Sequence, residues 1–416
     1  MRFKMFTAAA LVVALGVVAA TASAGGQRAQ ANKLTVWLQV DAQSGWPDIV
    51  AAANQQFQQQ NPGWTVDVQY QNWSDHLTKF DATIAGNTTP DVIEMGNTEM
   101  TKYMAAGAFA DLTSAKSQFD NSAHWLTGLA KSGSYGGKVY GVPYYAGSRV
   151  ITYRSDLFKK AGIAKTPTSL SQFQADLAKI GSMQKSTKGF SPLYVGGEDW
   201  YSALSFVFDY GGSIATTHAG KWVGTLNSPQ SIAGLTAFKN FFDATQGKST
   251  ATLDGTAPFP YTVFSQGLTA ANYGPAWYSC CTGAKYKTST AQFVMPSHTA
   301  GQPMPGFLGG SDLAVPAQSN AKSQAIQWIA DFTSNTNEKA LEAKGNIPNA
   351  TTLLGSSVNE RAAARSWFVP QAKHWVDVEN GNILKTMLAQ ILTGQLTVKQ
   401  AATVASVNIA QTLNGK

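Results

Sequence analysis

The fold is decided in residues 33–48, which read KLTVWLQVDAQSGWPD. Apolar side chains occupy every second position from Leu34 to Val40, and Trp37 falls on the opposite face of an extended chain. A short, strongly apolar run of this kind is typical of a strand that helices cover on both sides. The pattern therefore predicts that residues 33–40 form the first strand of a buried parallel sheet.

The segment after this strand carries a carboxylate, a glycine and an indole, at Asp41, Gly45 and Trp46. In an open α/β sheet, ligands bind in the crevice beyond the carboxyl ends of the strands. We therefore expect Asp41 and Trp46 to lie on a loop that forms one wall of a ligand site.

Strand and helix patterns alternate in the residues that follow. Pro47 opens a helix that Asn61-Pro62-Gly63 stops, and Ser74 is the expected cap of the next helix. The predicted elements are helix 47–60, strand 64–70, helix 74–86, strand 90–95, strands 136–145 and 150–153, helix 166–180, strand 267–273, and an almost wholly helical tail from 322 that is interrupted at 345–348. The alternation predicts an α/β fold with helices on both faces of a parallel sheet.

The amino terminus has the pattern of a signal peptide, assigned to residues 1–24. Arg2 and Lys4 precede an apolar stretch from Phe6 to Ala20, and Ala22-Ser23-Ala24 offers a cleavage site. The alternative is an uncleaved anchor, but the apolar run falls short of the roughly 20 residues that span a bilayer. The sequence thus predicts an exported protein, extracellular or at the cell surface, without a cysteine placed to carry a lipid.

The composition favours a neutral polar ligand. Charged residues make up 13% of the 416 residues, while 11 Trp, 14 Tyr and 20 Phe are available to contact apolar ring faces. The 31 basic and 24 acidic residues are scattered without a basic stripe, so nucleic acid is not an expected partner. The two cysteines, Cys280 and Cys281, are adjacent, which leaves a strained vicinal disulfide and two buried thiols as alternatives.

Patterns of enzyme active sites are mostly absent. The five histidines are isolated, no metal site has suitable spacing, and no phosphate-binding loop or nucleophile elbow occurs. Glu198 and Asp199 are adjacent, so they cannot easily flank a glycosidic bond without a distant partner such as Asp41 or Asp312. We expect no metal, no cofactor and no catalysis, with glycoside hydrolysis as the alternative.

Aromatic and polar residues recur where successive predicted strands end. The groups are Asp41 with Trp46, Asn97-Thr98-Glu99, Tyr144-Tyr145 with Arg149, Glu198-Asp199-Trp200-Tyr201, Trp277 after Gly274-Pro275, and Ser311-Asp312 after Gly309-Gly310. Aromatic rings stack on the apolar faces of sugars, while carboxylates, amides and arginine bind their hydroxyls. Singly, each tryptophan could be a core residue and each carboxylate a helix cap. Their recurrence predicts a carbohydrate site.

Several of these motifs resemble those of extracellular solute-binding proteins of the maltose-binding type, the soluble receptors of carbohydrate ABC transporters. The resemblance covers residues 33–416 and is closer still to actinobacterial oligosaccharide receptors. The motifs that carry it, in the order of the family, are Leu34-Thr35-Val36-Trp37 with Asp41, Pro90-Asp91-Val92, Tyr103 followed by Gly107-Ala108-Phe109-Ala110-Asp111-Leu112, Gly137-Lys138-Val139-Tyr140-Gly141-Val142-Pro143, Tyr153-Arg154-Ser155-Asp156-Leu157-Phe158, Gly274-Pro275-Ala276-Trp277 and Gly309-Gly310-Ser311-Asp312.

The resemblance implies two α/β lobes, each a mainly parallel sheet flanked by helices, that close on a ligand. The implied boundaries are 33–144 with 308–346 for the first lobe and 145–307 with 347–416 for the second. The ligand-binding residues expected from the strand ends and the resemblance are Asp41, Trp46, Asn97, Thr98, Glu99, Tyr145, Arg149, Glu198, Asp199, Trp200, Trp277, Ser311, Asp312 and Trp375.

Departures from the family pattern bear on the ligand. Met95 stands where the maltose receptor has an aromatic residue, and Gly381 falls where it has its last aromatic platform, so Trp375 or Trp367 is the expected replacement. The resemblance favours a β-linked disaccharide such as chitobiose, cellobiose or xylobiose. The expected partners are this sugar and the permease subunits of an ABC importer, with the receptor a monomer. A glycoside hydrolase and a polysaccharide-binding protein outside transport are the alternatives.

Overall fold

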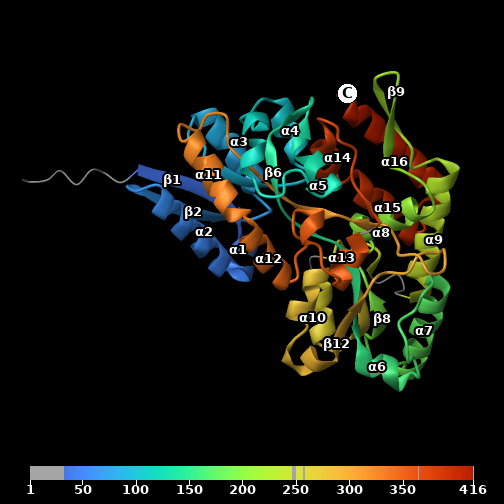
Figure 1. Ribbon diagram of the computed structural model, residues 1–416. Helices are drawn as coiled ribbons and strands as arrows, with labels where there is room; N and C mark the ends of the chain where they lie inside the picture. Colours follow the sequence, from blue (N-terminus) through green and yellow to red (C-terminus); the bar gives the residue numbers. More distant parts are fainter. Residues whose placement is uncertain (1–31, 246–249, 256–257, 364, 416) are drawn as a thin grey trace, which may run out of the picture.

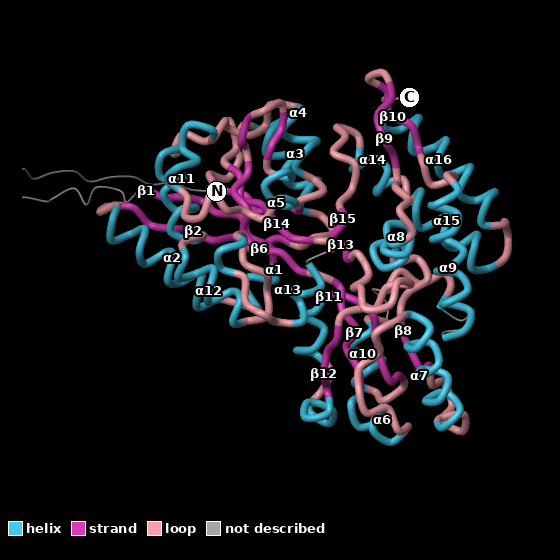
Figure 2. The backbone as a smooth tube through the Cα atoms, turned by 45° about the vertical axis from the view of Figure 1, so that its right-hand side comes forward, coloured by secondary structure: helices cyan, strands magenta, loops and turns pink. Residues whose placement is uncertain are grey.

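A computed structural model of the chain describes residues 32–245, 250–255, 258–363 and 365–415. The described chain forms two lobes, each built on its own sheet, and the two sheets lie apart in both views (Figures 1 and 2). We call the part built on the sheet that contains β1 the first lobe, and the part built on the sheet that contains β7 the second lobe. The predicted signal peptide lies outside the described residues.

Five strands form the sheet of the first lobe. In spatial order they are β2 (Trp64–Gln71), β1 (Asn32–Gln39), β3 (Val92–Gly96), β14 (Gly309–Ala314) and β6 (Gly141–Gly147). β1 pairs in parallel with β2 and β3, whereas β14 runs antiparallel to both β3 and β6. The sheet is therefore mainly parallel in direction, with β1, β2, β3 and β6 running one way and β14, through which the chain re-enters from the second lobe, running against them.

Helices cover both faces of this sheet, as the alternation predicts. Leu34, Val36 and Leu38 pack in one cluster with α2 (Pro47–Gln60) and α11 (Lys322–Phe332). On the opposite face, residues of β1 and β3 pack with α3 (His76–Gly86) and α4 (Met100–Ala105). The period-two pattern of the first strand thus sorts its side chains between two cores.

Two local expectations near β1 are wrong. The strand ends at Gln39, and Val40–Gly45 forms the short helix α1 where a last strand residue and a loop are expected. Gln39 is the last β1 residue paired with β2, and its amide donates to the Glu94 side chain (2.8 Å). Helix α3 follows Asp75 and not Ser74, since residues 73–75 form a turn.

The sheet of the second lobe has four strands. In order they are β12 (Thr290–Phe293), β7 (Arg149–Arg154), β11 (Thr269–Pro275) and β8 (Ser191–Tyr194). Only β11 and β8 pair in parallel, so this sheet is mixed. The helices of this part of the chain are α6 (Ser155–Lys160), α7 (Leu170–Met183), α8 (Trp200–Asp209), α9 (Pro229–Thr245) and α10 (Pro260–Ser265).

The tail is helical apart from one short strand that the sequence did not indicate. Its helices are α12 (Asn335–Ala343), α13 (Val358–Ala363), α14 (Trp375–Asn380), α15 (Ile383–Thr393) and α16 (Val398–Leu413). β15 (Ser366–Trp367) pairs with β13 (Gly306–Phe307). α11 and α12 lie on the first lobe, whereas α14, α15 and α16 lie on the second (Figure 1).

The remaining elements are short. They are α5 (Thr127–Ser132), β4 (Ser134–Tyr135), β5 (Lys138–Val139), β9 (Ala215–His218), β10 (Lys221–Gly224), and the 3-10 helices η1 (Thr113–Gln118), η3 (Ala276–Cys281), η4 (Ala284–Ser289) and η5 (Thr351–Leu353). Cys281 is disulfide-bonded, which excludes the alternative of two free thiols. Among the residues that the structure describes, no helix combines the length and the apolar character needed to cross a membrane.

The chain crosses between the lobes where β6 continues into β7, where β13 continues into β14, and again between α12 and α14. The second crossing is also held by side-chain contacts from the first lobe. The Asn97 side chain donates to the Leu308 carbonyl (3.1 Å), and the Asn97 amide donates to the Gly310 carbonyl (3.0 Å). Asn97 is buried, so both bonds fix the loop after β3 against the second of these connections. Sequence-distant segments thus meet at the junction of the lobes.

Buried carboxyl groups make the stability of the fold depend on pH. Asp312 of β14 is fully buried, with one oxygen bonded to the Ser132 hydroxyl (2.7 Å) and the other without a partner. Burial raises the pKa of Asp312 to about 7, although the Ser132 hydrogen bond lowers it. Burial also raises the pKa of Glu338 on α12. The folded protein therefore binds more protons than the unfolded chain between about pH 4 and pH 7.

We expect the melting temperature to be higher at pH 5 than at pH 8, because stability falls as these groups lose their protons. The substitution Asp312→Asn removes one of them and should stabilise the protein by about 2 kcal/mol at pH 8, with little effect at pH 5. Thermal melting at both pH values measures the change. Asp67→Asn, at an exposed position, is the control. An Asp312→Asn protein with the pH profile of the wild type would contradict this account.

Candidate functional site

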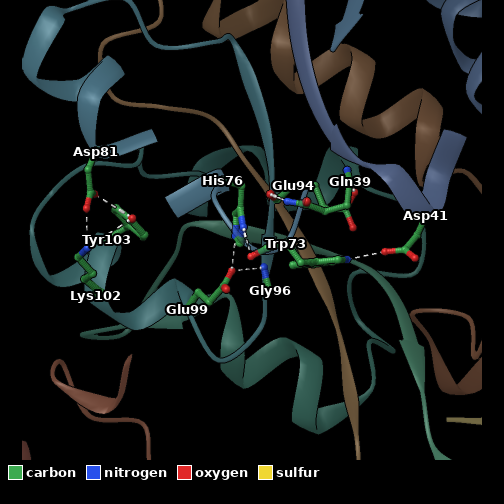
Figure 3. Close-up of polar contacts among 10 residues, drawn as sticks. All are labelled: Gln39, Asp41, Trp73, His76, Asp81, Glu94, Gly96, Glu99, Lys102 and Tyr103. Atoms are coloured by element: carbon green, nitrogen blue, oxygen red, sulfur yellow. Dashed lines mark hydrogen bonds and ion pairs between the residues drawn. The ribbon is translucent and has the colours of Figure 1, made fainter. Parts of the chain in front are cut away.

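The first lobe presents a carboxylate and an indole together. Asp41, in α1, accepts a hydrogen bond from Trp73 Nε1 (2.5 Å; Figure 3). Trp73 follows β2, and its side chain is 39% exposed, which is unusual for a tryptophan. A Cβ on Gly96 would lie 3.4 Å from the Trp73 ring, so the loop after β3 passes close beneath the indole.

The loop after β3 is held by the Glu99 carboxylate. One Glu99 oxygen accepts from the Gly96 amide (2.8 Å) and lies 2.9 Å from His76 Nε2 (Figure 3). The His76 ring is buried, stands edge-on to Trp73 at 5.3 Å, and reaches the Trp73 carbonyl through Nδ1 (3.1 Å). Glu99, His76 and Trp73 thus form one connected unit.

The contacts within this unit raise the pKa of His76. Burial lowers the pKa of His76, but the Glu99 hydrogen bond, the Glu99 charge and the Trp73 carbonyl raise it by more, so the net pKa lies above the ordinary value. The contacts with Glu99 therefore favour the protonated form of His76.

We predict that Glu99→Gln lowers the pKa of His76, because the amide keeps the size of the side chain but removes its charge. Titration of the His76 ring by nuclear magnetic resonance measures the change. Glu342→Gln, on α12, is the matched control. A His76 pKa that is the same in Glu99→Gln and in wild type would show that Glu99 does not carry the effect.

A second carboxyl group lies beneath this surface. Glu94 of β3 is 1% exposed, and one of its oxygens accepts from the Gln39 amide. Burial raises the pKa of Glu94 to about 7; the Gln39 amide and the neighbouring Ser311 hydroxyl lower it, and the Asp41 charge raises it. The other oxygen of Glu94 and the Gln39 side-chain oxygen are buried without hydrogen-bond partners.

Tyr145 and Ser311 lie beside Glu94 in the same part of the first lobe. They are paired in register between β6 and β14, and the Tyr145 ring packs edge-on against Trp46 at 5.2 Å. Burial raises the pKa of Tyr145, and the charges of Glu94 and Asp41 act in the same direction. Trp46 itself is buried, with its indole nitrogen bonded to the Tyr144 hydroxyl.

The second lobe contributes an ion pair on an aromatic ring. Arg149 of β7 donates to Asp199 (2.8 Å) and to the Ser202 hydroxyl (3.2 Å), and both charged side chains are largely buried. The guanidinium lies over the Tyr201 ring at 5.1 Å. Asp199 also caps α8 by accepting from the Ser202 amide. The capping role and the arginine pair together fix the carboxylate.

The residues described on the first lobe and those on the second lobe come together at α14 of the second lobe. Glu379 of α14 accepts from Trp375 Nε1 (2.6 Å). Burial raises the pKa of Glu379 to about 7; the Trp375 hydrogen bond lowers it, the Glu99 charge raises it, and the Thr98 hydroxyl lowers it. Thr98 and Glu99 belong to the first lobe, so the loop after β3 lies against α14 in this conformation.

The structure thus gathers half of the expected residues in one region and gives the others different surroundings. The expected residues that lie where the two lobes meet are Asp41, Thr98, Glu99, Tyr145, Arg149, Asp199 and Ser311. Ser311 is itself fully buried, and Asn97 is buried at the connection between β13 and β14, whereas Trp46, Trp200, Asp312 and Trp375 are buried within a lobe. Trp200 and Trp375 pack against each other at 6.1 Å, and neither exposes a ring face here.

Glu198 and Trp277 lie further out on the second lobe. Burial raises the pKa of Glu198, while the Lys385 charge lowers it and the Asp254 charge raises it. Trp277 is 47% exposed and packs edge-on against Tyr278 at 4.8 Å.

Sequence reasoning missed Trp73, His76, Glu94 and Glu379. Trp73 carries the signal that identified the other residues, an aromatic side chain just after a predicted strand. Glu94 interrupts an otherwise apolar strand, which is a second usable signal. His76 and Glu379 lie within helices and acquire their surroundings only from tertiary packing.

Comparison with known proteins supports one family. The family model described as bacterial extracellular solute-binding protein matches residues 38–339. The diacetylchitobiose-binding protein DasA of Streptomyces coelicolor is 29% identical over 384 residues, which cover 89% of this chain and 88% of DasA. A probable ABC transporter-binding protein of Deinococcus radiodurans is 25% identical over 258 residues, 58% of this chain and 59% of that protein.

Solved structures share the two-lobed fold. The GacH receptor of Streptomyces glaucescens has a TM-score of 0.76 at 19% identity, covering 92% of this chain and 98% of that one. An ABC substrate-binding protein of Listeria monocytogenes, solved with cycloalternan, has a TM-score of 0.75 at 21% identity, covering 92% and 100%. At these identities the likeness establishes the fold and not the ligand.

Proposed function

The chain belongs to the bacterial extracellular solute-binding proteins, and we propose that it captures a small oligosaccharide between its lobes for an ABC importer. The observation that carries this proposal is the pairing of the exposed Trp73 indole with the Asp41 carboxylate, at the junction that Arg149 faces from the other lobe. An aromatic face beside planar acceptors and donors suits a ligand that has both apolar ring faces and hydroxyls. Ligand contacts to both lobes favour the closed form.

A β-linked disaccharide is the favoured ligand. DasA, which carries the name of a diacetylchitobiose-binding protein, matches this chain over most of its length. Two of the structural neighbours were solved with acarbose and with cycloalternan, but they are less similar in sequence. We therefore rank diacetylchitobiose first and treat cellobiose and xylobiose as alternatives.

The remaining parts of the proposal concern how the receptor works. It is exported, acts as a monomer, carries out no covalent chemistry and passes its ligand to permease subunits in the membrane. The lobe boundaries at 307–308 and 346–347 belong to the proposal as well, and so does the one at 144–145, which falls inside β6 of the first-lobe sheet. Related proteins that are solute receptors or ABC transporter-binding proteins support it.

The proposal predicts that N,N′-diacetylchitobiose stabilises the protein in a thermal-shift screen of mono- and disaccharides. A ligand at about 100 times its Kd adds about 2.7 kcal/mol to the free energy of unfolding, which gives a clear shift. Isothermal titration then gives the affinity. Analysis of the incubated sugars for new reducing ends tests the hydrolase alternative; cleavage, or no shift with any oligosaccharide, would overturn the proposal.

We also predict that Asp41→Asn weakens binding of the sugar found in that screen by at least about tenfold, because hydrogen bonds to charged groups contribute about 1.5–3 kcal/mol. Asp67→Asn is the control, since Asp67 lies on the same lobe but pairs with Lys33 on the exposed surface. Isothermal titration measures both variants. Equal affinities for Asp41→Asn and wild type would remove Asp41 from the site.

A further inference from the structure

The sheet of the second lobe has one edge that lies away from the junction, and we call it the outer edge. β7 ends there at Arg154, which pairs in register with Thr290 at the start of β12. β8 and β11 begin at the same edge, because Ser191 pairs with Thr269. Arg149, at the start of β7, lies at the opposite edge. Figure 2 shows α6 and β12 at the end of the second lobe that is farthest from the first lobe.

Three separate segments bring lysines to the outer edge. They are α6 with the turn that follows it, the turn before β8, and η4 before β12. Their exposed lysines are Lys159, Lys165, Lys185, Lys188, Lys285 and Lys287. The sequence shows no basic run because the fold, and not the chain order, collects these charges.

Carboxylates do not neutralise this group of lysines. None of the ion pairs of the described chain includes any of the six. Asp156, at the start of α6, is instead held by Arg154 (2.7 Å), and the Arg154 guanidinium lies over the Tyr286 ring at 3.7 Å. The outer edge therefore carries a net positive charge that is available to a partner.

A cavity of about 450 Å³ opens on this surface, beside α6. Its lining combines two lysines, two hydroxyl groups and apolar side chains, among them Lys159, Lys165, Ser155, Thr166, Phe158 and Ile163. Lysine is a frequent ligand of phosphate groups, whereas the apolar side chains suit hydrocarbon. A free inorganic anion would use only the polar part of this lining. A phosphate group that is attached to hydrocarbon uses both parts.

The spread of the lysines favours an extended partner over a single small molecule. Only Lys159 and Lys165 line the cavity, while the other four lie on neighbouring segments of the same edge. A membrane surface with anionic lipids presents many phosphate headgroups at once, and each lysine near such a surface strengthens binding roughly fivefold. A bilayer thus satisfies the cavity and the surrounding charges together.

We infer that the outer edge of the second lobe binds the surface of a membrane that contains anionic phospholipids, with one phosphate headgroup between Lys159 and Lys165. This contact holds the receptor at the membrane. It leaves the junction free, because the junction lies at the opposite edge of the same sheet. The inference goes beyond the proposed function and does not depend on which sugar is bound.

Co-sedimentation with vesicles tests this inference. The protein should begin after the predicted signal peptide, since an apolar segment would itself bind bilayers. We expect binding to vesicles of equal parts phosphatidylglycerol and phosphatidylcholine, weak binding to phosphatidylcholine alone, and a loss of binding as salt is raised. Replacing both cavity lysines, Lys159→Ala with Lys165→Ala, should weaken binding to the anionic vesicles at least about tenfold.

The matched control removes two lysines from other surfaces, Lys339→Ala on α12 with Lys399→Ala on α16, and should change vesicle binding less than twofold. Both double variants should melt at the temperature of the wild type.

Three results would overturn the inference. They are no binding of the wild type to anionic vesicles at low salt, equal binding by the wild type and the cavity variant, and binding to soluble polyphosphate without binding to vesicles. The last result would assign the outer edge to an anionic polymer. Sugar affinity, measured by isothermal titration, tests the proposed function separately and should be the same in the cavity variant as in the wild type.

Discussion

The position of the loop after β3, and the electrostatics where the two lobes meet, both depend on the Glu99 carboxylate. It fixes the loop after β3 through the Gly96 amide and pairs with His76, which is otherwise buried away from solvent. Across the junction, it raises the pKa values of Glu379 and Tyr201, whose burial is the larger cause. A single side chain therefore shapes one lobe and acts electrostatically on the other.

This arrangement places carboxyl groups close together in a poorly solvated region. Glu94 and Glu379 both have pKa values raised to about 7, and burial is the main cause for each. Burying an ionised group without a partner is costly, so such groups are stable only when protonated or hydrogen-bonded. On the second lobe, Arg149 is paired with the Asp199 carboxylate. In the proposed function, the hydroxyls of a sugar supply further donors as the lobes close.

The sequence predicts the architecture well because that information is local. The alternation from Leu34 to Leu38 and the Asn61-Pro62-Gly63 stop define β1 and α2, and the family motifs predict the two lobes. The residue-level expectations were less complete, because burial and pairing depend on long-range packing. Nothing near Trp375 in the sequence indicates that Trp200 packs against it, and nothing near Trp73 indicates that Asp41 accepts its hydrogen bond. The antiparallel insertion of β14 likewise depends on where the chain returns from the second lobe.

The central claim is that one sugar contacts both lobes at the junction. A crystal structure of the protein with N,N′-diacetylchitobiose tests this most directly. The account predicts sugar density between the lobes, within hydrogen-bond distance of Asp41 on one side and of Arg149 or Asp199 on the other. Density confined to one lobe, or a sugar bound away from these residues, would contradict it.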